Sequence, residues 1–213
     1  MTTHFDPPSM PAQPGPATSL AAPDTATVVV APAPGARHLL PLAAAGAAVA
    51  VALGVYGRTH EPTGGVIVDL GFPSMRAMKA WFATGAVALV VVQILSALAM
   101  FGRLPKVTTV PRWVPFLHRW SGTTAFVLTL PVAYHCLWAL GFQTGSARTF
   151  AHSLFGCAFY GAMTTKLLGL RSDRLPKWAI PVLGSLLVVT LTAVWLTSAL
   201  WFFTSVDFPA LPG

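Results

Sequence analysis

The sequence predicts an all-α integral membrane protein, a bundle of five transmembrane helices behind a disordered N-terminal tail. Hydrophobic residues make up 54% of the 213 residues and charged residues only 9%, whereas a soluble fold carries roughly 25% charged residues to cover its surface. The mean hydropathy is +0.67. The apolar residues gather in runs of about 20, the length that crosses a ~30 Å hydrocarbon core. Because the chain has too few charges to cover a globule in water, a lipid-facing surface is the simpler solution.

The N-terminal segment differs in composition from the rest of the chain. Residues 1–36 contain eight prolines and neither Lys nor Arg. Such a segment buries too little apolar surface to offset the entropy lost on ordering. We therefore expect a disordered cytoplasmic tail over residues 1–36, a transmembrane domain over 37–206 and a short C-terminal tail over 207–213.

Five apolar runs define the expected helices, and Pro or Gly punctuates the segments between them. The first run could also be the apolar part of a signal peptide, with Arg37 ahead of it. Its length of 18 residues and the long tail before it favour an uncleaved helix. The expected helices cover about residues 39–56, 80–101, 116–142, 149–170 and 179–203.

Lys and Arg are distributed unevenly between the two sides of such a bundle. Nine lie on the side of the N-terminal tail and four on the opposite side. Because cytoplasmic segments carry an excess of these residues, the N-terminus is expected inside and the C-terminus outside. The nine are Arg37, Arg103, Lys106, Arg112, Arg119, Lys166, Arg171, Arg174 and Lys177, and the four are Arg58, Arg76, Lys79 and Arg148. A composition rich in Ala, Pro and Gly, with Arg outnumbering Lys, indicates a high-GC bacterial genome and hence a bacterial plasma membrane.

Several function classes lack support in the sequence. No basic helix with interleaved aromatic residues is present, so nucleic-acid binding is not expected. No nucleotide-binding motif and no nucleophile–base pair is recognisable, which leaves an enzymatic role open only as redox chemistry. The expected spans contain no Asp or Glu, which argues against a proton-coupled or cation-coupled transporter. Cys136 and Cys157 form no CxxCH motif for c-type haem, and buried thiols are favoured over a disulfide between them.

Two histidines are expected inside the outer ends of neighbouring helices. His135 lies near the end of the third helix and His152 near the start of the fourth, and a short connection makes these helices antiparallel neighbours. An ionisable group within a span is costly, which makes it a functional candidate. Two imidazoles at this depth could ligate one haem b axially. Gly156, one turn after His152, would let a flat macrocycle approach the backbone, and Pro131 would kink the third helix.

A structural alternative stands beside this hypothesis. Ser153, Cys157 and Gly161 form a small-residue stripe of the kind that packs membrane helices closely. His152 could then be an interfacial residue, and His135 could bond a backbone carbonyl. Adjacent helices pack about 8–10 Å apart, which is too close for two axial imidazoles with an iron between them. Either the third and fourth helices splay, or the ligands pair differently.

Three further histidines are weaker candidates. His118 and His38 lie at the inner ends of the third and first helices, where they could form a second, cytoplasmic-side pair or be interfacial residues. His118 is 17 residues from His135, which is about 25 Å along a helix and on a different face. His60 lies beside Glu61 in an outer loop, where it could bind a metal weakly or cap a site above the third and fourth helices.

Four segments carry a resemblance to a known family. The segments His118–Gly122, Tyr134–Gly141, Gly57–Gly64 and Leu154–Ala162 resemble a family of uncharacterised membrane proteins from high-GC bacteria, over about residues 50–203. That family has no assigned role, so the resemblance adds little about function.

A second, more distant resemblance points to haem. Arg119–Gly122, followed by an apolar run and His135, resembles the haem-bearing helix of ferric-reductase-like membrane cytochromes. This resemblance implies haem b. Those proteins usually carry regularly spaced histidine pairs on two helices, and this sequence departs from that pattern, which argues against a second haem.

The leading hypothesis is a small b-type cytochrome-like subunit that passes electrons between a quinol or partner protein and an acceptor outside. Its candidate ligands are His135 and His152, followed by His118. A haem-free accessory subunit that scaffolds a membrane complex is the alternative, because the small-residue stripe fits it equally well. Metal or solute transport ranks last, and the sequence leaves the oligomeric state open.

Overall fold

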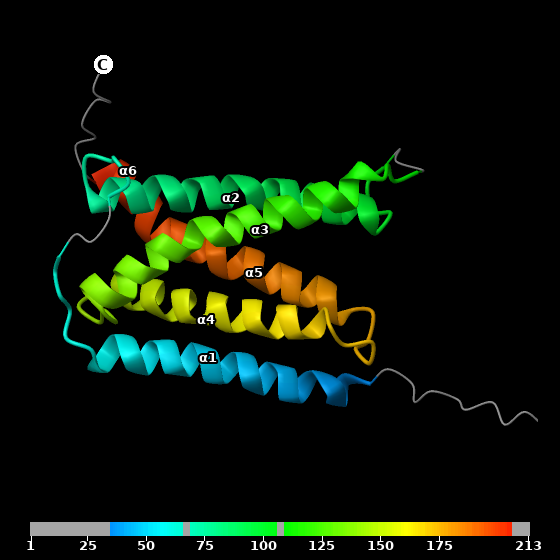
Figure 1. Cartoon of the computed structure of the whole chain (residues 1–213), viewed down its shortest axis with the longest axis horizontal. Coiled ribbons are helices and arrows are strands. Elements are labelled where there is room, and N and C mark those ends of the chain that lie inside the picture. The colour runs from blue at the N-terminus through cyan, green and yellow to red at the C-terminus, as the bar shows by residue number, and fades with distance from the viewer. Residues whose placement is uncertain (1–34, 66–68, 106–108, 206–213) are drawn as a thin grey trace, which may run out of the picture. The chain divides into compact units, whose positions relative to one another are not determined.

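The computed structural model describes residues 35–65, 69–105 and 109–205. The tails expected over residues 1–36 and 207–213 lie almost wholly outside this part of the chain. All regular structure in the described residues is helical, which confirms the all-α class (Figure 1). The helices are α1 (Leu39–Thr59, after a 3₁₀ turn η1 at Ala36–His38), α2 (Met75–Met100), α3 (Trp113–His135), α4 (Ala147–Gly169), α5 (Ala179–Trp195) and α6 (Trp201–Ser205).

Two π-helical segments interrupt the regular hydrogen bonding of this bundle. The first, η2 (Cys136–Leu140), directly follows α3, and the second, η3 (Leu196–Leu200), joins α5 to α6. Pro131 lies inside α3 shortly before η2. Proline removes one backbone donor from a helix, and π-helical turns are frequent at functional sites. Both segments therefore mark the same end of the bundle as the one with irregular helical hydrogen bonding.

The starts of α2 and α4 are set by capping residues that hydropathy alone does not locate. Ser74 accepts a hydrogen bond from the Ala77 backbone N–H at 3.1 Å. This cap starts α2 at Met75, five residues before the expected apolar run. Ser146 caps α4 and forms a reciprocal capping box with Thr149. Side-chain caps satisfy orphan N–H groups of the first turn, which fixes where a helix begins.

Four helical stretches are long and apolar enough to cross a membrane, which indicates a multi-pass membrane protein. They are Ala36–Thr59, Met75–Met100, Trp113–Leu140 and Ala179–Thr204. The fifth long helix, α4, is the more polar one. It lies between α1 and α5, so neighbouring helices cover much of its surface (Figure 1).

The remaining packing follows three helix pairs and a central core. α2 pairs with α3, α4 pairs with both α1 and α5, and α5 also contacts α2. The backbones of α3 and α4 do not pack closely on one another, although a short loop joins them. The central core combines side chains from α2, α3, α4 and α5, namely Ala86, Val90, Ala125, Phe159, Ala162, Leu187 and Leu191.

The contact between α1 and α4 depends on small residues. A Cβ added to Gly161 would lie 2.6 Å from the Gly46 carbonyl oxygen, and one added to Gly46 would clash with Thr165 Oγ1. A Cβ at Gly54, two turns further along α1, would lie 3.9 Å from Cys157 Sγ. The stripe that contains Cys157 and Gly161 therefore faces α1. Close approach of this kind is how membrane helices gain packing energy.

Candidate functional site: an apolar cavity with a cationic lining

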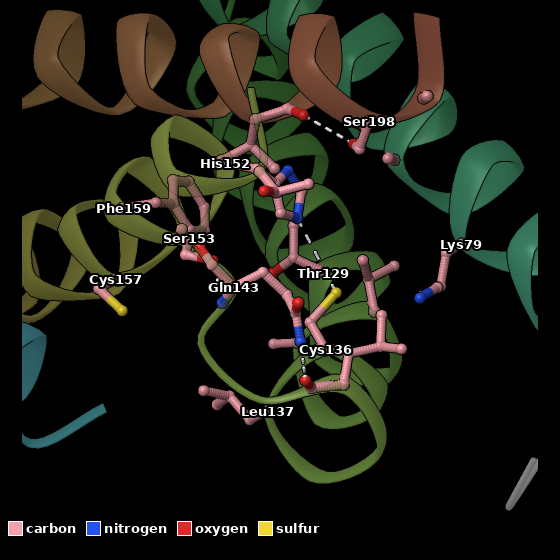
Figure 2. A pocket seen from close by; sticks show the side chains of 18 of the residues that line it. Lys79, Thr129, Cys136, Leu137, Gln143, His152, Ser153, Cys157, Phe159 and Ser198 are labelled. Carbon is pink, nitrogen blue, oxygen red and sulfur yellow. Dashed lines mark hydrogen bonds between the residues drawn. The ribbon is translucent and has the colours of Figure 1, made fainter. Parts of the chain in front are cut away.

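A cavity of about 280 Å³ lies at the end of the bundle that carries the α3–α4 loop. Its walls come from all six α-helices, from η2 and η3, and from the loop between η2 and α4. The volume is close to the lower end of the roughly 300–1,000 Å³ that is usual for cofactor sites. Most of the lining is apolar, and Figure 2 shows the polar side chains that interrupt it. The separation of α3 from α4 leaves this space open. It is the splayed arrangement that a haem between these two helices would need.

His152 is the only histidine that lines this cavity among the described residues. Its Nδ1 lies 3.3 Å from Thr197 Oγ1. The Thr197 hydroxyl donates to the Ala193 carbonyl at 2.7 Å, so it accepts from the imidazole Nδ1–H. The Val194 backbone also interacts with this ring. Because Nδ1 carries the proton, Nε2 presents a lone pair toward the cavity.

Cys136 is the neighbour of that lone pair. Its Sγ lies 4.0 Å from His152 Nε2, across the gap between η2 and α4 (Figure 2). Cys157 also lines the cavity, and both cysteines are free thiols, as the sequence favoured. Histidine and cysteine donors therefore meet within an otherwise apolar space.

Three cationic side chains line the same cavity, and no Asp or Glu does so within the described part of the chain. Arg76 and Lys79 come from the first turns of α2. Arg148 comes from the first turn of α4, where its NH1 donates to the Thr197 carbonyl at 2.6 Å. Its guanidinium also lies 4.0 Å from the centroid of the Trp201 ring. These unmatched charges give the cavity a preference for an anionic ligand.

The deep end of the cavity is closed by a bridge from α4 to α3. The Tyr160 hydroxyl lies 3.0 Å from the Thr129 carbonyl oxygen and 2.9 Å from Thr129 Oγ1. Gly156 lies between His152 and Tyr160 on the same face of α4, and a Cβ there would meet nothing within 4 Å. At Gly156, no side chain therefore covers the α4 backbone where it faces the cavity. The sequence-based hypothesis needs this, because a flat macrocycle must approach the backbone there.

His135 takes a different position from His152. It is 1% exposed, and its Nδ1 lies 2.8 Å from the Pro131 carbonyl oxygen. It does not line the cavity. The structure thus does not bring the two imidazoles of the expected pair into one space.

His118 belongs to a polar cluster at the opposite end of α3. Its Nδ1 lies 2.8 Å from Ser96 Oγ. Gln93 Nε2 donates to the His118 carbonyl at 2.5 Å and to Ser121 Oγ at 2.7 Å. This cluster joins α2 to α3. His38 lies at the start of α1, which packs on α4 rather than on α3, so the structure does not bring His38 and His118 together.

His60 caps the end of α1 between two aromatic rings. Its ring stacks on Tyr56 at 5.0 Å and lies 4.7 Å from the Trp138 ring. Its Nε2 is buried without a hydrogen-bond partner beside a small pocket of about 220 Å³. Within the described residues, no group of three His, Cys, Asp or Glu side chains could hold a metal ion.

Sequence reasoning missed most of the polar residues that line the cavity or bond His152. Thr197 and Tyr160 look like ordinary span residues, and Arg76, Lys79 and Arg148 entered only as orientation signals. One available signal was that Lys79 and Arg148 flank two expected spans without any acidic residue nearby in the sequence. Charges that are placed at one depth and lack counter-charges indicate an anion site.

The fold and the site define a multi-pass helical membrane protein with one apolar, cation-lined cavity near an end of its bundle. The chain belongs to a family of unknown function (DUF6529), whose model matches residues 39–210. This match confirms the resemblance to an uncharacterised family. Among curated proteins and solved structures, none matches the chain.

Proposed function

We propose that the protein is a small b-type cytochrome-like electron-transfer subunit of a bacterial plasma membrane, with one haem b in the cavity and His152 as an axial ligand. The observation that carries the proposal is the His152 ring, whose Nδ1–H is bonded to Thr197 and whose Nε2 lone pair lies in an apolar cavity. Metal-binding histidines characteristically donate their other N–H in this way, which fixes the tautomer and the ring orientation.

The other lining residues suit the rest of such a ligand. Haem is an apolar macrocycle with two carboxylates on one edge. Arg76, Lys79 and Arg148 supply the cations that pair with carboxylates. Gly156 leaves the α4 backbone accessible to a flat ring. The donor set, the charge and the apolar lining therefore all fit this group.

Each residue has a separate task in the proposed site. When bound, the haem would supply reversible one-electron transfer. His152 would hold the iron, Thr197 orients His152, and the three cations would hold the propionates. The Tyr160–Thr129 bridge holds α4 against α3 at the deep end. A quinol or a partner protein would donate the electron, and an acceptor outside the cell would receive it.

We also propose the finer topology that this role requires. All five long helices cross the bilayer, with the N-terminus inside and the C-terminus outside. The positive-inside distribution of nine against four basic residues supports this orientation. The cavity then opens near the outer surface, where an external acceptor can approach.

The test is a dithionite-reduced minus air-oxidised absorption spectrum of the detergent-purified protein, combined with a pyridine haemochrome assay. We expect a sharp α-band of haem b, about one haem per chain, and loss of this band in His152→Ala. The variant His4→Ala, which removes an imidazole from the N-terminal segment, should keep it. A flat spectrum from wild-type protein expressed with ample haem would sink the proposal and favour a haem-free scaffold subunit.

A further inference from the structure

We infer that Cys136, rather than a second histidine, supplies the other axial ligand in the His152 cavity. The inference rests on the proposed function, because it concerns the same haem. It departs from the sequence-based expectation, in which His135 and His152 form the ligand pair. Three observations carry it: the distance between the two donors, the placement of the competing donors, and the charge around the sulfur.

The distance suits two donors on opposite sides of one metal ion. Cys136 Sγ and His152 Nε2 are 4.0 Å apart. In zinc proteins, metal–thiolate and metal–imidazole bonds are about 2.3 and 2.0 Å long, so trans ligands with such bonds lie about 4.3 Å apart. Bonds from haem iron to these donors are of the same order. A displacement of a few tenths of an ångström would therefore bring both atoms into axial positions.

The two donors also reach the gap from opposite walls. Cys136 is the first residue of η2, and His152 lies in α4, while the α3 and α4 backbones stand apart. A pair on facing walls can bind the two faces of one macrocycle. A pair from a single wall could not do so.

The other potential ligands near His152 Nε2 are committed elsewhere. Cys157 Sγ lies on the α1 side of α4, close to Gly54. The Ser153 hydroxyl accepts from the Gln143 backbone N–H at 3.1 Å. The Tyr160 hydroxyl is bonded to Thr129. His135 does not line the cavity, and Cys136 is the donor that lies beside the lone pair.

The charge of the cavity favours a sulfur ligand. Thiolate is the form of cysteine that binds metals, and it carries a negative charge that must be balanced in an apolar space. Arg76, Lys79 and Arg148 line the same cavity as Cys136. Because no carboxylate lines the cavity within the described residues, these cations are free to balance both a thiolate and the haem propionates.

Iron K-edge X-ray absorption of the purified, haem-loaded full-length protein tests the inference directly. We expect an Fe–S distance of about 2.3 Å in the wild type. Cys157→Ala is the matched control, since it removes the other thiol of the same cavity and should retain the Fe–S signal. Cys136→Ala should lose that signal completely while it still binds haem through His152. Low-temperature EPR of the ferric protein should change in Cys136→Ala and remain unchanged in Cys157→Ala.

The outcomes separate this inference from the proposed function. Wild-type protein that binds haem through His152 and shows only nitrogen ligands would overturn the Cys136 assignment and leave the cytochrome proposal standing. Wild-type protein that binds no haem would overturn both. The X-ray absorption spectrum of the wild-type protein needs no variant, so the Cys136 assignment is decided even if Cys136→Ala fails to fold.

Discussion

At the scale of single residues, the hydrogen bonds of His152 explain why this imidazole differs from the other histidines of the chain. His135 is bonded to a backbone carbonyl of its own helix, and His118 to a serine of the neighbouring helix. His152 is bonded to Thr197 through Nδ1, and its Nε2 lies in a cavity. Thr197 is therefore a positioning residue, which acts on a ligand only through the ring that it orients.

Replacing Thr197 with valine should weaken haem binding without abolishing it. Valine keeps the shape of threonine but removes the hydroxyl that accepts from Nδ1–H. Loss of such an outer partner costs about 10–100-fold in metal affinity. We expect roughly tenfold, the lower end of that range, because the Val194 backbone also interacts with the ring. Haem titration of the apoprotein measures the change, together with a shift of the ferric absorption spectrum.

Thr192→Val is the matched control for this variant. Thr192 lies in α5, which η3 directly continues, and it neither lines the cavity nor bonds His152. Equal affinity losses in the two variants would show that threonine in this stretch of helix matters only for helix packing. The positioning role of Thr197 would then be wrong.

Arg148 provides the second prediction at this scale. Its guanidinium is held by the Thr197 carbonyl and by the Trp201 ring, so it is fixed at the cavity wall. A hydrogen bond to a charged group contributes about 1.5–3 kcal/mol, and each 1.4 kcal/mol corresponds to a tenfold change in affinity. Arg148→Gln should therefore weaken haem binding by about tenfold or more in the same titration. Arg174→Gln, which removes an exposed cation after α4, should have no effect, and a similar loss in both would contradict a local role.

At the scale of helices, the packing of α1 on α4 depends on a close approach of two glycines. α1 contacts mainly α4, and Gly46 and Gly161 let the two backbones meet. In a bilayer, lipid tails are as apolar as leucine, so such helices are held by van der Waals contact. One methyl group at the crossing point should separate them.

Gly46→Ala should destabilise the bundle by about 1–3 kcal/mol, the usual cost of overpacking a close contact. Its Cβ would clash with Thr165 Oγ1 and with the Gly161 carbonyl oxygen. The free energy of unfolding, measured by SDS titration in mixed micelles, checks the effect. Gly54→Ala places the same methyl group on the same helix, at an ordinary contact distance of 3.9 Å. If Gly54→Ala destabilises the protein as strongly, the close approach at Gly46 is not what holds α1.

The helices were predictable from sequence, whereas the cavity was not. Apolar length and breakers locate a span because the bilayer fixes its length. Which face of α3 meets the cavity depends on the rotation of that helix in the bundle. His135 and Cys136 are consecutive, so they differ by about 100° around the helix, and the sequence does not say which of them faces α4. The π-helical turns could not be predicted from the sequence either. In η3, the Thr197 carbonyl accepts a hydrogen bond from Arg148, which lies 49 residues away in the chain.

At the scale of the whole transmembrane unit, exposed tryptophans lie at both ends of the helices. Trp113, Trp120 and Trp178 are exposed near one end, and Trp81, Trp138 and Trp201 near the other. Tryptophan is enriched at both membrane–water interfaces. The pattern fits a bundle that spans the bilayer in full. It also fits a crossing by α4, whose charges and small residues are shielded by α1 and α5.

Thiol labelling of intact cells should establish both the crossing of α4 and the orientation of the chain. In a background with Cys136 and Cys157 replaced by alanine, Gly145→Cys and Asp173→Cys place single exposed thiols in the segments before and after α4. If the N-terminus is inside, a membrane-impermeant maleimide labels Gly145→Cys in intact cells. Asp173→Cys reacts only after permeabilisation, since nine basic residues hold its side in the cytoplasm. Labelling of both thiols in intact cells would mean that α4 does not cross, and the reverse pattern would place the cavity on the cytoplasmic side, where an external electron acceptor could not reach it.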